Sequence, residues 1–257
     1  MVIETPDRSG NMNLDRQISD FVERLRQAAG DNLVSVVLYG SAATGAFIEQ
    51  RSDINLLCIL NRLDDGGLNA VSTVVQWWSR ELRYRPPMVL TQDELITSAD
   101  VFAIETLDIQ AQHKLLFGRD ILVSVQIPMN LHRVQVEHEL RVLLLRLRQH
   151  YILAYGSSDD LEKALVRSAS SAGTLLRHAL IAIQDDSPAS SRAALPKVAE
   201  RFGIDASSVN AVLDLHDGKR VESNIDKVYL NFLAALETVV QKIDRAVPKK
   251  ELQRVGH

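Results

Sequence analysis

The sequence predicts an α+β domain followed by an all-α helical bundle. In the first half, short runs of β-branched and aliphatic residues alternate with segments whose apolar residues recur at helical spacing. After Pro128 only the helical spacing remains, in segments separated by short polar connections. We therefore expect a flexible N-terminal segment at residues 1–12, a first domain at residues 13–127 and a helical bundle at residues 128–257.

The composition is that of an ordinary soluble globular protein: the 257 residues are 46% apolar and 24% charged, with a net charge of −4. Acidic and basic residues are mixed along the chain, which argues against a long nucleic acid as the partner. The single cysteine, Cys58, lies in an apolar run and is expected to be a buried thiol. The chain has no apolar stretch of about 18 residues and no apolar segment near its start, so we expect no membrane association and a cytoplasmic location.

The first predicted elements are a helix and two strands. Residues 14–29 place apolar side chains on one helical face. Residues 32–39 form a β-branched run that ends at Gly40, and residues 54–60 are apolar at nearly every position. A strand without polar alternation is typical of the centre of a sheet that is covered on both faces.

A second helix and a third strand follow. Residues 64–83 are typical of a turn that leads into a helix. Residues 86–91 predict a short strand, and the prolines that open it favour the edge of a sheet or the start of a strand. Thr91 and Glu94 fit the S/T-x-x-E capping box, so a short helix should begin there.

The end of the first half predicts one more helix, over residues 101–117 and closed by Gly118. Residues 121–128 are compatible with a last strand or with an extended linker that ends at Pro128. Helical spacing in the second half predicts helices over residues 130–156, 157–184, 190–203, 205–218 and 224–247.

The stretch LYGSAATGAFIEQRSDINLL, from Leu38 to Leu57, contains the residues that indicate chemistry. A strand that ends in Gly-Ser is followed by a loop and then by Ser-Asp at the start of the next strand. Glycine lets the backbone approach a ligand, and backbone N–H groups with the Ser41 hydroxyl can hold phosphate oxygens. Asp53, at the mouth of the next strand, can bind a Mg²⁺ ion that bridges those phosphates.

This pattern of strand, Gly-Ser, loop and Ser-Asp resembles the polymerase-β-type nucleotidyltransferase superfamily, whose small-molecule branch includes the aminoglycoside nucleotidyltransferases. The resemblance implies a mixed sheet flanked by helices, a C-terminal helical bundle, and a ligand cleft between the two. It also implies a nucleoside triphosphate and Mg²⁺ as ligands. The implied reaction moves a nucleoside monophosphate onto a hydroxyl group of a small molecule or a protein.

By the same resemblance, Gly40 and Ser41 occupy the phosphate-binding positions and Asp53 the position of the first metal-binding carboxylate. Asn55 stands where a second carboxylate is expected, and Met88 falls at the position of the third. An amide offers one neutral oxygen, and a thioether is a poor ligand for a hard cation and no base. We therefore expect nucleotide binding to survive better than catalysis, with Mg²⁺ weakly bound.

Other charged residues could compensate, although each has a simpler explanation. Glu49 is typical of a solvated loop residue, whereas Glu105 and Asp108 lie three residues apart on one face of the predicted helix and suit a polar helix face. Lys163, Arg167 and Arg177 could line a cleft that faces the nucleotide, but they are more typical of a solvated helix face.

Two functional hypotheses remain open at this point. The first is a nucleotidyltransferase whose activity is weakened or lost. The second is a non-catalytic nucleotide sensor or protein-interaction module, in which the helical bundle is the working surface and the chain forms a homodimer.

Overall fold

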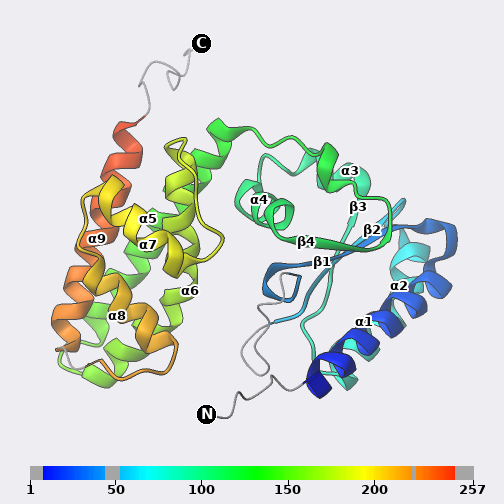
Figure 1. The fold of residues 1–257 in the computed structure, drawn as a ribbon, viewed down its shortest axis with the longest axis horizontal. Helices are drawn as coiled ribbons and strands as arrows, with labels where there is room; N and C mark the ends of the chain where they lie inside the picture. The colour runs from blue at the N-terminus through cyan, green and yellow to red at the C-terminus, as the bar shows by residue number, and fades with distance from the viewer. Residues whose placement is uncertain (1–7, 44–52, 222–223, 247–257) are drawn as a thin grey trace, which may run out of the picture. The chain divides into compact units, whose positions relative to one another are not determined.

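The computed structural model describes residues 8–43, 53–221 and 224–246, and it divides into two compact units, Met1–Ile127 and Pro128–His257 (Figure 1). The first unit contains a mixed sheet flanked by helices, and the described part of the second is helical. The predicted fold class is therefore confirmed.

The sheet of the first unit has four strands: β1 (Leu33–Tyr39), β2 (Asn55–Leu60), β3 (Met88–Thr91) and β4 (His113–Gly118). Their order across the sheet is β3-β2-β1-β4. β1 pairs antiparallel with both β2 and β4, whereas β2 pairs parallel with β3. The strand rich in apolar residues, β2, is central, and the proline-opened strand β3 is at an edge, as predicted.

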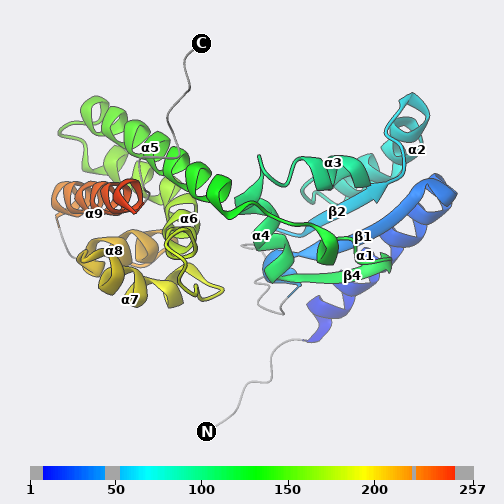
Figure 2. The ribbon, with the colours of Figure 1, turned by 90° about the horizontal axis from the view of Figure 1, so that it is seen from above.

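Helices cover both faces of this sheet (Figures 1 and 2). On one face lie α1 (Arg8–Ala29) and α2 (Asp65–Gln76), and on the other lie α3 (Gln92–Thr97) and α4 (Ala103–Ala111). Because strand side chains alternate between faces, the sheet separates two apolar cores. The first core includes Phe21, Leu56, Cys58 and Trp78, and the second includes Val37, Leu57, Ile59, Leu95 and Ile109.

Two local predictions in this unit are confirmed. Cys58 is buried in the central strand, and burial raises the pKa of its thiol to about 12, so it is inert at neutral pH. The capping box forms as well: the Thr91 backbone N–H donates to Glu94 at 2.7 Å, and the Glu94 backbone N–H donates to the Thr91 hydroxyl at 3.1 Å. This reciprocal pair starts α3 directly after β3.

The helix predicted over residues 101–117 is wrong in its second half. α4 ends at Ala111, and Gln112 has φ −141° and ψ 79°, which leads the chain into strand β4. Leu115 and Phe117 then pair with the edge of β1 instead of continuing a helix. Helical spacing had dominated the prediction because the partner strand is distant in the sequence, and such pairing outweighs local propensity.

The segment after β4 is not a strand. Leu122–Ser124 forms a single 3₁₀ turn, and Ile121, Leu122 and Val125 are buried in the core below the sheet. The N-terminal helix also differs from the prediction, since α1 begins at Arg8 rather than at Leu14.

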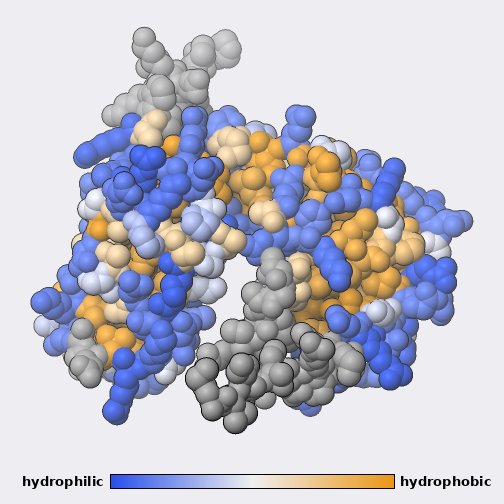
Figure 3. Space-filling model, viewed as in Figure 1, coloured by the Kyte–Doolittle hydropathy of each residue, from blue (hydrophilic) through white to orange (hydrophobic). Residues whose placement is uncertain are grey.

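The second unit is built from helices that bury a shared core. Near its centre Tyr229 is fully buried, and its hydroxyl donates to the Leu147 carbonyl at 2.9 Å, which ties the last helix to the first. Figure 3 shows that the visible face of each unit carries hydrophilic residues interspersed with hydrophobic patches. The helices are α5 (Met129–Leu153), α6 (Ser158–Ala182), α7 (Ser191–Phe202), α8 (Ala206–His216) and α9 (Ile225–Arg245).

Among the described residues, no helix combines the length and the apolar character that crossing a bilayer requires.

Gly118 fixes the end of β4 and can be tested against a matched glycine. It has φ +78°, and a Cβ added there would lie 2.0 Å from the Val34 carbonyl oxygen. Gly30 also has positive φ, at +52°, but a Cβ there would meet nothing within 4 Å. In urea unfolding, Gly30→Ala should cost about 1–2 kcal/mol for its left-handed backbone, and Gly118→Ala should cost about 3 kcal/mol or more because β4 must also shift. Equal losses would contradict the assigned contact between β4 and β1.

Candidate functional site

The turn that ends β1 has a conformation that favours glycine. Gly40 has φ +76°, and the turn continues as a 3₁₀ helix over Gly40–Ala42. A Cβ added at Gly40 would lie 3.3 Å from Nδ2 of Asn55, so the backbone of the turn passes close to the start of β2. The Gly40 N–H donates to the Gln112 carbonyl at 3.0 Å. Gly40 therefore shapes the turn, and its amide is already used within the fold.

The predicted acidic residue, Asp53, lies just before the strand that passes this turn. Asn55 is half-buried and sits directly opposite Tyr39, the residue before Gly40, in the β1–β2 ladder. Asp53 is exposed and lies two positions before Asn55, which limits the separation of their Cα atoms to about 7 Å. Its carboxylate forms no hydrogen bond or ion pair with the residues that the structure describes. Glu49 lies outside the described residues.

The sheet register shows which side chains share the face of Asn55. Asn55 and Leu57 are two apart on β2 and point to the same side, and Met88 on β3 is the direct partner of Leu57. Met88 is 38% exposed at the start of its strand. On the other side of β2, Tyr39 pairs with Asn55 and His113 pairs with Tyr39. A row of His113, Tyr39 and Asn55 therefore crosses the sheet, with Met88 beside its end.

This set of side chains does not fit a two-metal site. It offers the carboxylate of Asp53, the amide oxygen of Asn55 and the thioether of Met88, whereas two divalent cations need several anionic oxygens. Within the described ranges, no group of three or more His, Cys, Asp or Glu residues is placed to hold a metal. A single Mg²⁺ ion bound between Asp53, Asn55 and a ligand's phosphates is the most that these donors support.

The alternative acids do not change this donor set. Glu94 is used as the capping partner of Thr91. Glu105 and Asp108 both lie on α4, where Glu105 is exposed and Asp108 is half-buried, and each has an interaction within the fold. Lys163 on the bundle forms an ion pair with Asp159 of its own helix at 2.5 Å, which is typical of a solvated helix face.

Arg85 is a charged residue near the candidate site that sequence reasoning missed. Burial raises the pKa of Tyr39, and the charge of Arg85 partly offsets this rise, so the guanidinium lies within electrostatic range of the end of β1. The Arg85 carbonyl accepts a hydrogen bond from Nε1 of the buried Trp78 at 3.0 Å, which anchors its backbone. The signal in the sequence was its place just before Pro86 and Pro87, at the mouth of β3.

His113 and Asp120 form a second feature that the sequence did not reveal. Nε2 of His113 lies 2.9 Å from Oδ2 of Asp120, and Nδ1 lies 3.1 Å from the Gln110 carbonyl oxygen. Burial disfavours the charged imidazole, but these two bonds outweigh it and raise the pKa of His113. Because both ring nitrogens are bonded, the imidazole links the end of α4 to the segment that follows β4.

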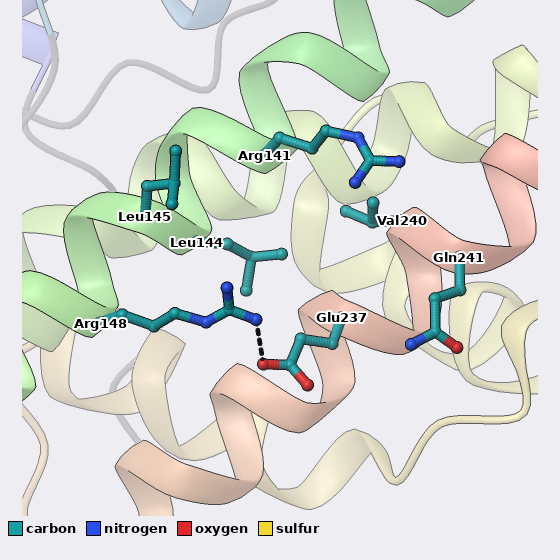
Figure 4. Close-up of a pocket in the computed structure, with 7 residues that line it drawn as sticks. All are labelled: Arg141, Leu144, Leu145, Arg148, Glu237, Val240 and Gln241. Carbon is teal, nitrogen blue, oxygen red and sulfur yellow. Dashed lines mark hydrogen bonds and ion pairs between the residues drawn. The ribbon is translucent and has the colours of Figure 1, made fainter.

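The helical unit contains a groove of about 240 Å³ between α5 and α9, which Figure 4 shows. Arg148 and Glu237 face each other across it and form an ion pair at 2.6 Å. Arg141 pairs with Glu137 on its own helix at 2.8 Å. Since these charged groups already have partners, this groove is a weaker candidate for a ligand site than the end of β1.

Known proteins provide independent information on the chain. Residues 16–144, half of the chain, match the family model described as the nucleotidyltransferase domain. Among solved structures, the crystal structure of spectinomycin adenyltransferase AAD(9) from Enterococcus faecialis with ATP and spectinomycin matches with a TM-score of 0.56 and 15% sequence identity. The match covers 88% of this chain and 98% of that chain, and at this identity it shows a shared fold. No curated protein matches the chain significantly.

The His113–Asp120 pair makes a prediction with a defined sign. The folded pKa of His113 is raised above its ordinary value of 6.5, so the pair's contribution to stability is complete below about pH 6.5 and is lost as pH rises through the folded pKa. In an NMR titration, Asp120→Asn should lower the pKa of His113, because it removes the negative partner. Glu139→Gln, beside the exposed His138, is the control and should leave it unchanged. An unaltered His113 pKa in Asp120→Asn would contradict the assigned pair.

Proposed function

The chain belongs to the nucleotidyltransferase domain family, within the polymerase-β-like nucleotidyltransferase superfamily, and we propose that it binds a nucleoside triphosphate at the end of β1. The single observation that carries this proposal is the exposed carboxylate of Asp53, which forms no hydrogen bond or ion pair with the described residues and lies near the end of the sheet where the Gly40–Ser41 turn passes Asn55. The predicted residues Gly40, Ser41, Asp53 and Asn55 form the proposed site.

The phosphates are held by groups beyond Gly40, since the Gly40 amide is bonded to Gln112. The Ser41 hydroxyl donates to a phosphate oxygen, and the amides of the turn add further donors. Arg85 supplies positive charge from the mouth of β3. Asp53 and the amide oxygen of Asn55 hold at most one Mg²⁺, which would neutralise phosphate charge when bound.

Nucleotidyl transfer is weakened or lost in this proposal. In the family reaction an acceptor hydroxyl attacks the α-phosphorus, the bond to pyrophosphate breaks, and the hydroxyl proton passes to a base. Met88 offers no basic atom at the position where the resemblance expects a carboxylate. Asp53 is the one described carboxylate among the proposed site residues, and it cannot both bind a cation and act as an efficient base.

The proposed nucleotide binding is compatible with two functions: an enzyme that transfers the nucleotide, and a sensor that binds it without transfer. The structural neighbour was solved with ATP and spectinomycin, which supports a nucleoside triphosphate and a small molecule with a hydroxyl group as the pair of substrates. The replacement of carboxylates at Asn55 and Met88 favours the second version, a nucleotide sensor without catalysis, in which the helical unit contacts a partner or a second copy.

Calorimetric titration with ATP, with and without Mg²⁺, tests the site directly. Ser41→Ala should raise the Kd about tenfold, because it removes a hydrogen bond to a charged group. Asp53→Ala should remove the part of the affinity that depends on Mg²⁺, whereas Asp100→Ala, an exposed control on the same unit, should change neither. No binding of ATP, GTP, CTP or UTP by the wild-type chain would reject the proposal.

A radiolabelled-nucleotide transfer assay on the same proteins separates the two versions. Transfer that Asp53→Ala abolishes identifies an enzyme, and binding without transfer identifies the sensor.

Placing carboxylates at positions 55 and 88 should change ATP affinity in opposite directions with and without Mg²⁺. The double variant Asn55→Asp with Met88→Asp places carboxylates at the first residues of β2 and β3, in addition to that of Asp53. Both substituted positions are at least partly exposed. Without Mg²⁺ it should bind ATP more weakly than wild type, because the carboxylates repel the triphosphate, and with Mg²⁺ it should bind more tightly. Leu68→Asp, on the exposed side of α2, is the control for added charge alone. If Mg²⁺ has no larger effect on the double variant than on wild type, Asn55 and Met88 do not lie at the cation position.

A further inference from the structure

A second concave surface lies in the first unit, on the solvent side of α1 and α2, and we call it the α1–α2 groove. Its volume is about 790 Å³, which is within the range of pockets that hold small molecules. The small side chains of Ala28 and Ala70 leave room between the helices. The groove is lined by Arg24, Gln27, Ala28, Ala70, Thr73, Val74, Gln76, Trp77, Arg80 and Glu81.

The groove contains a guanidinium group that is held in place without a carboxylate. The Arg24 guanidinium carbon lies 4.2 Å from the centre of a Trp77 ring, so the planar group stacks on the indole. Stacking leaves the N–H donors at the edge of the guanidinium available, in the geometry that matches a carboxylate or phosphate. Trp77 is half-buried beside the fully buried Trp78, and this packing fixes the position of the Trp77 indole.

Arg80 adds a second cation that likewise has no acidic partner among the described residues. Within the described part of the chain, neither Arg24 nor Arg80 has a carboxylate within 4.0 Å. Arg26, two residues from Arg24 on α1, shows the usual alternative, since it pairs with Glu23 at 2.8 Å. Glu81 is the one acid that lines the groove, so the lining has two positive charges and one negative charge.

These observations define a ligand class. We infer that the α1–α2 groove binds a small organic anion, whose carboxylate or phosphate is held by Arg24 and Arg80 and whose apolar part rests on Val74 and Trp77. The sheet separates this site from Asn55 and Met88, because α1 and α2 pack on the face opposite to those residues. The groove is therefore a site distinct from the proposed triphosphate site.

The two tryptophans make this inference measurable by NMR. The chain has two Trp residues, so a ¹⁵N spectrum shows two indole N–H signals, which Trp77→Phe assigns. The Trp78 indole is buried and donates to the Arg85 carbonyl, so its signal is an internal control for folding. Benzoate and inorganic phosphate are the probes: benzoate carries a ring and a carboxylate, and phosphate carries charge alone.

We expect saturable movement of the Trp77 signal with at least one probe and a fixed Trp78 signal. Arg24→Gln and Arg80→Gln should each raise the Kd of the probe about tenfold, as expected for a lost charge-assisted hydrogen bond. Glu81→Gln should lower the Kd, because it removes the repulsive charge, and this opposite sign distinguishes ligand binding from general damage to the fold. Arg26→Gln is the matched control on α1 and should leave the Kd unchanged.

Two results would overturn the inference: no saturable movement of the Trp77 signal with either probe, or movement that persists unchanged in both Arg24→Gln and Arg80→Gln. Ser41→Ala separates the two proposals. It should leave the Trp77 response intact even where it weakens ATP binding, so failure at one site can be told from failure at the other.

Discussion

The antiparallel pairing of β1 with β2 is the constraint on which the candidate site depends. It places Tyr39 opposite Asn55, so the turn after Tyr39 must pass over the first residue of β2. A Cβ at Gly40 would crowd the Asn55 amide at 3.3 Å, and the positive φ of Gly40 allows the chain to turn there. Strand β4 pairs antiparallel with the other edge of β1. The residue before β4, Gln112, accepts the Gly40 N–H through its carbonyl. Three segments that are distant in the sequence thus meet at one end of the sheet.

The electrostatics of this end differ from those of a two-metal centre. A carboxylate, an amide and a thioether from Asp53, Asn55 and Met88 leave little negative charge to hold divalent cations. The positive charge of Arg85 lies near the same end of β1. In the proposed function, a triphosphate would therefore be attracted here mainly by direct contacts with the protein, whereas in a two-metal site the cations would supply most of the neutralising charge. Binding and catalysis have different requirements, and our proposal is that the residues present meet those of binding better than those of catalysis.

The sequence predicted features that depend on local pattern and missed those that depend on distant pairing. The central place of β2, the edge position of β3 and the Thr91–Glu94 capping box followed from apolar continuity, prolines and a four-residue motif. Strand β4 was mistaken for helix because its conformation is decided by the free edge of β1, about eighty residues earlier in the chain. Arg85 was missed for a related reason, since its proximity to Tyr39 arises only once β3 and β1 lie in one sheet. The groove between α1 and α2 likewise needs both helices in place before Arg24 can stack on Trp77.

The residues near the end of β1 do not provide equal evidence of function. Gly40 is needed by the fold itself, because its backbone conformation, its bond to Gln112 and its contact with Asn55 all constrain the turn. A glycine would be required there whether or not a phosphate ever binds. Asp53 is different: it is exposed, and its carboxylate forms no hydrogen bond or ion pair with the residues that the structure describes. For the proposed triphosphate site, an exposed acid without such a partner, two residues before Asn55, is therefore a stronger argument than the glycine of the turn.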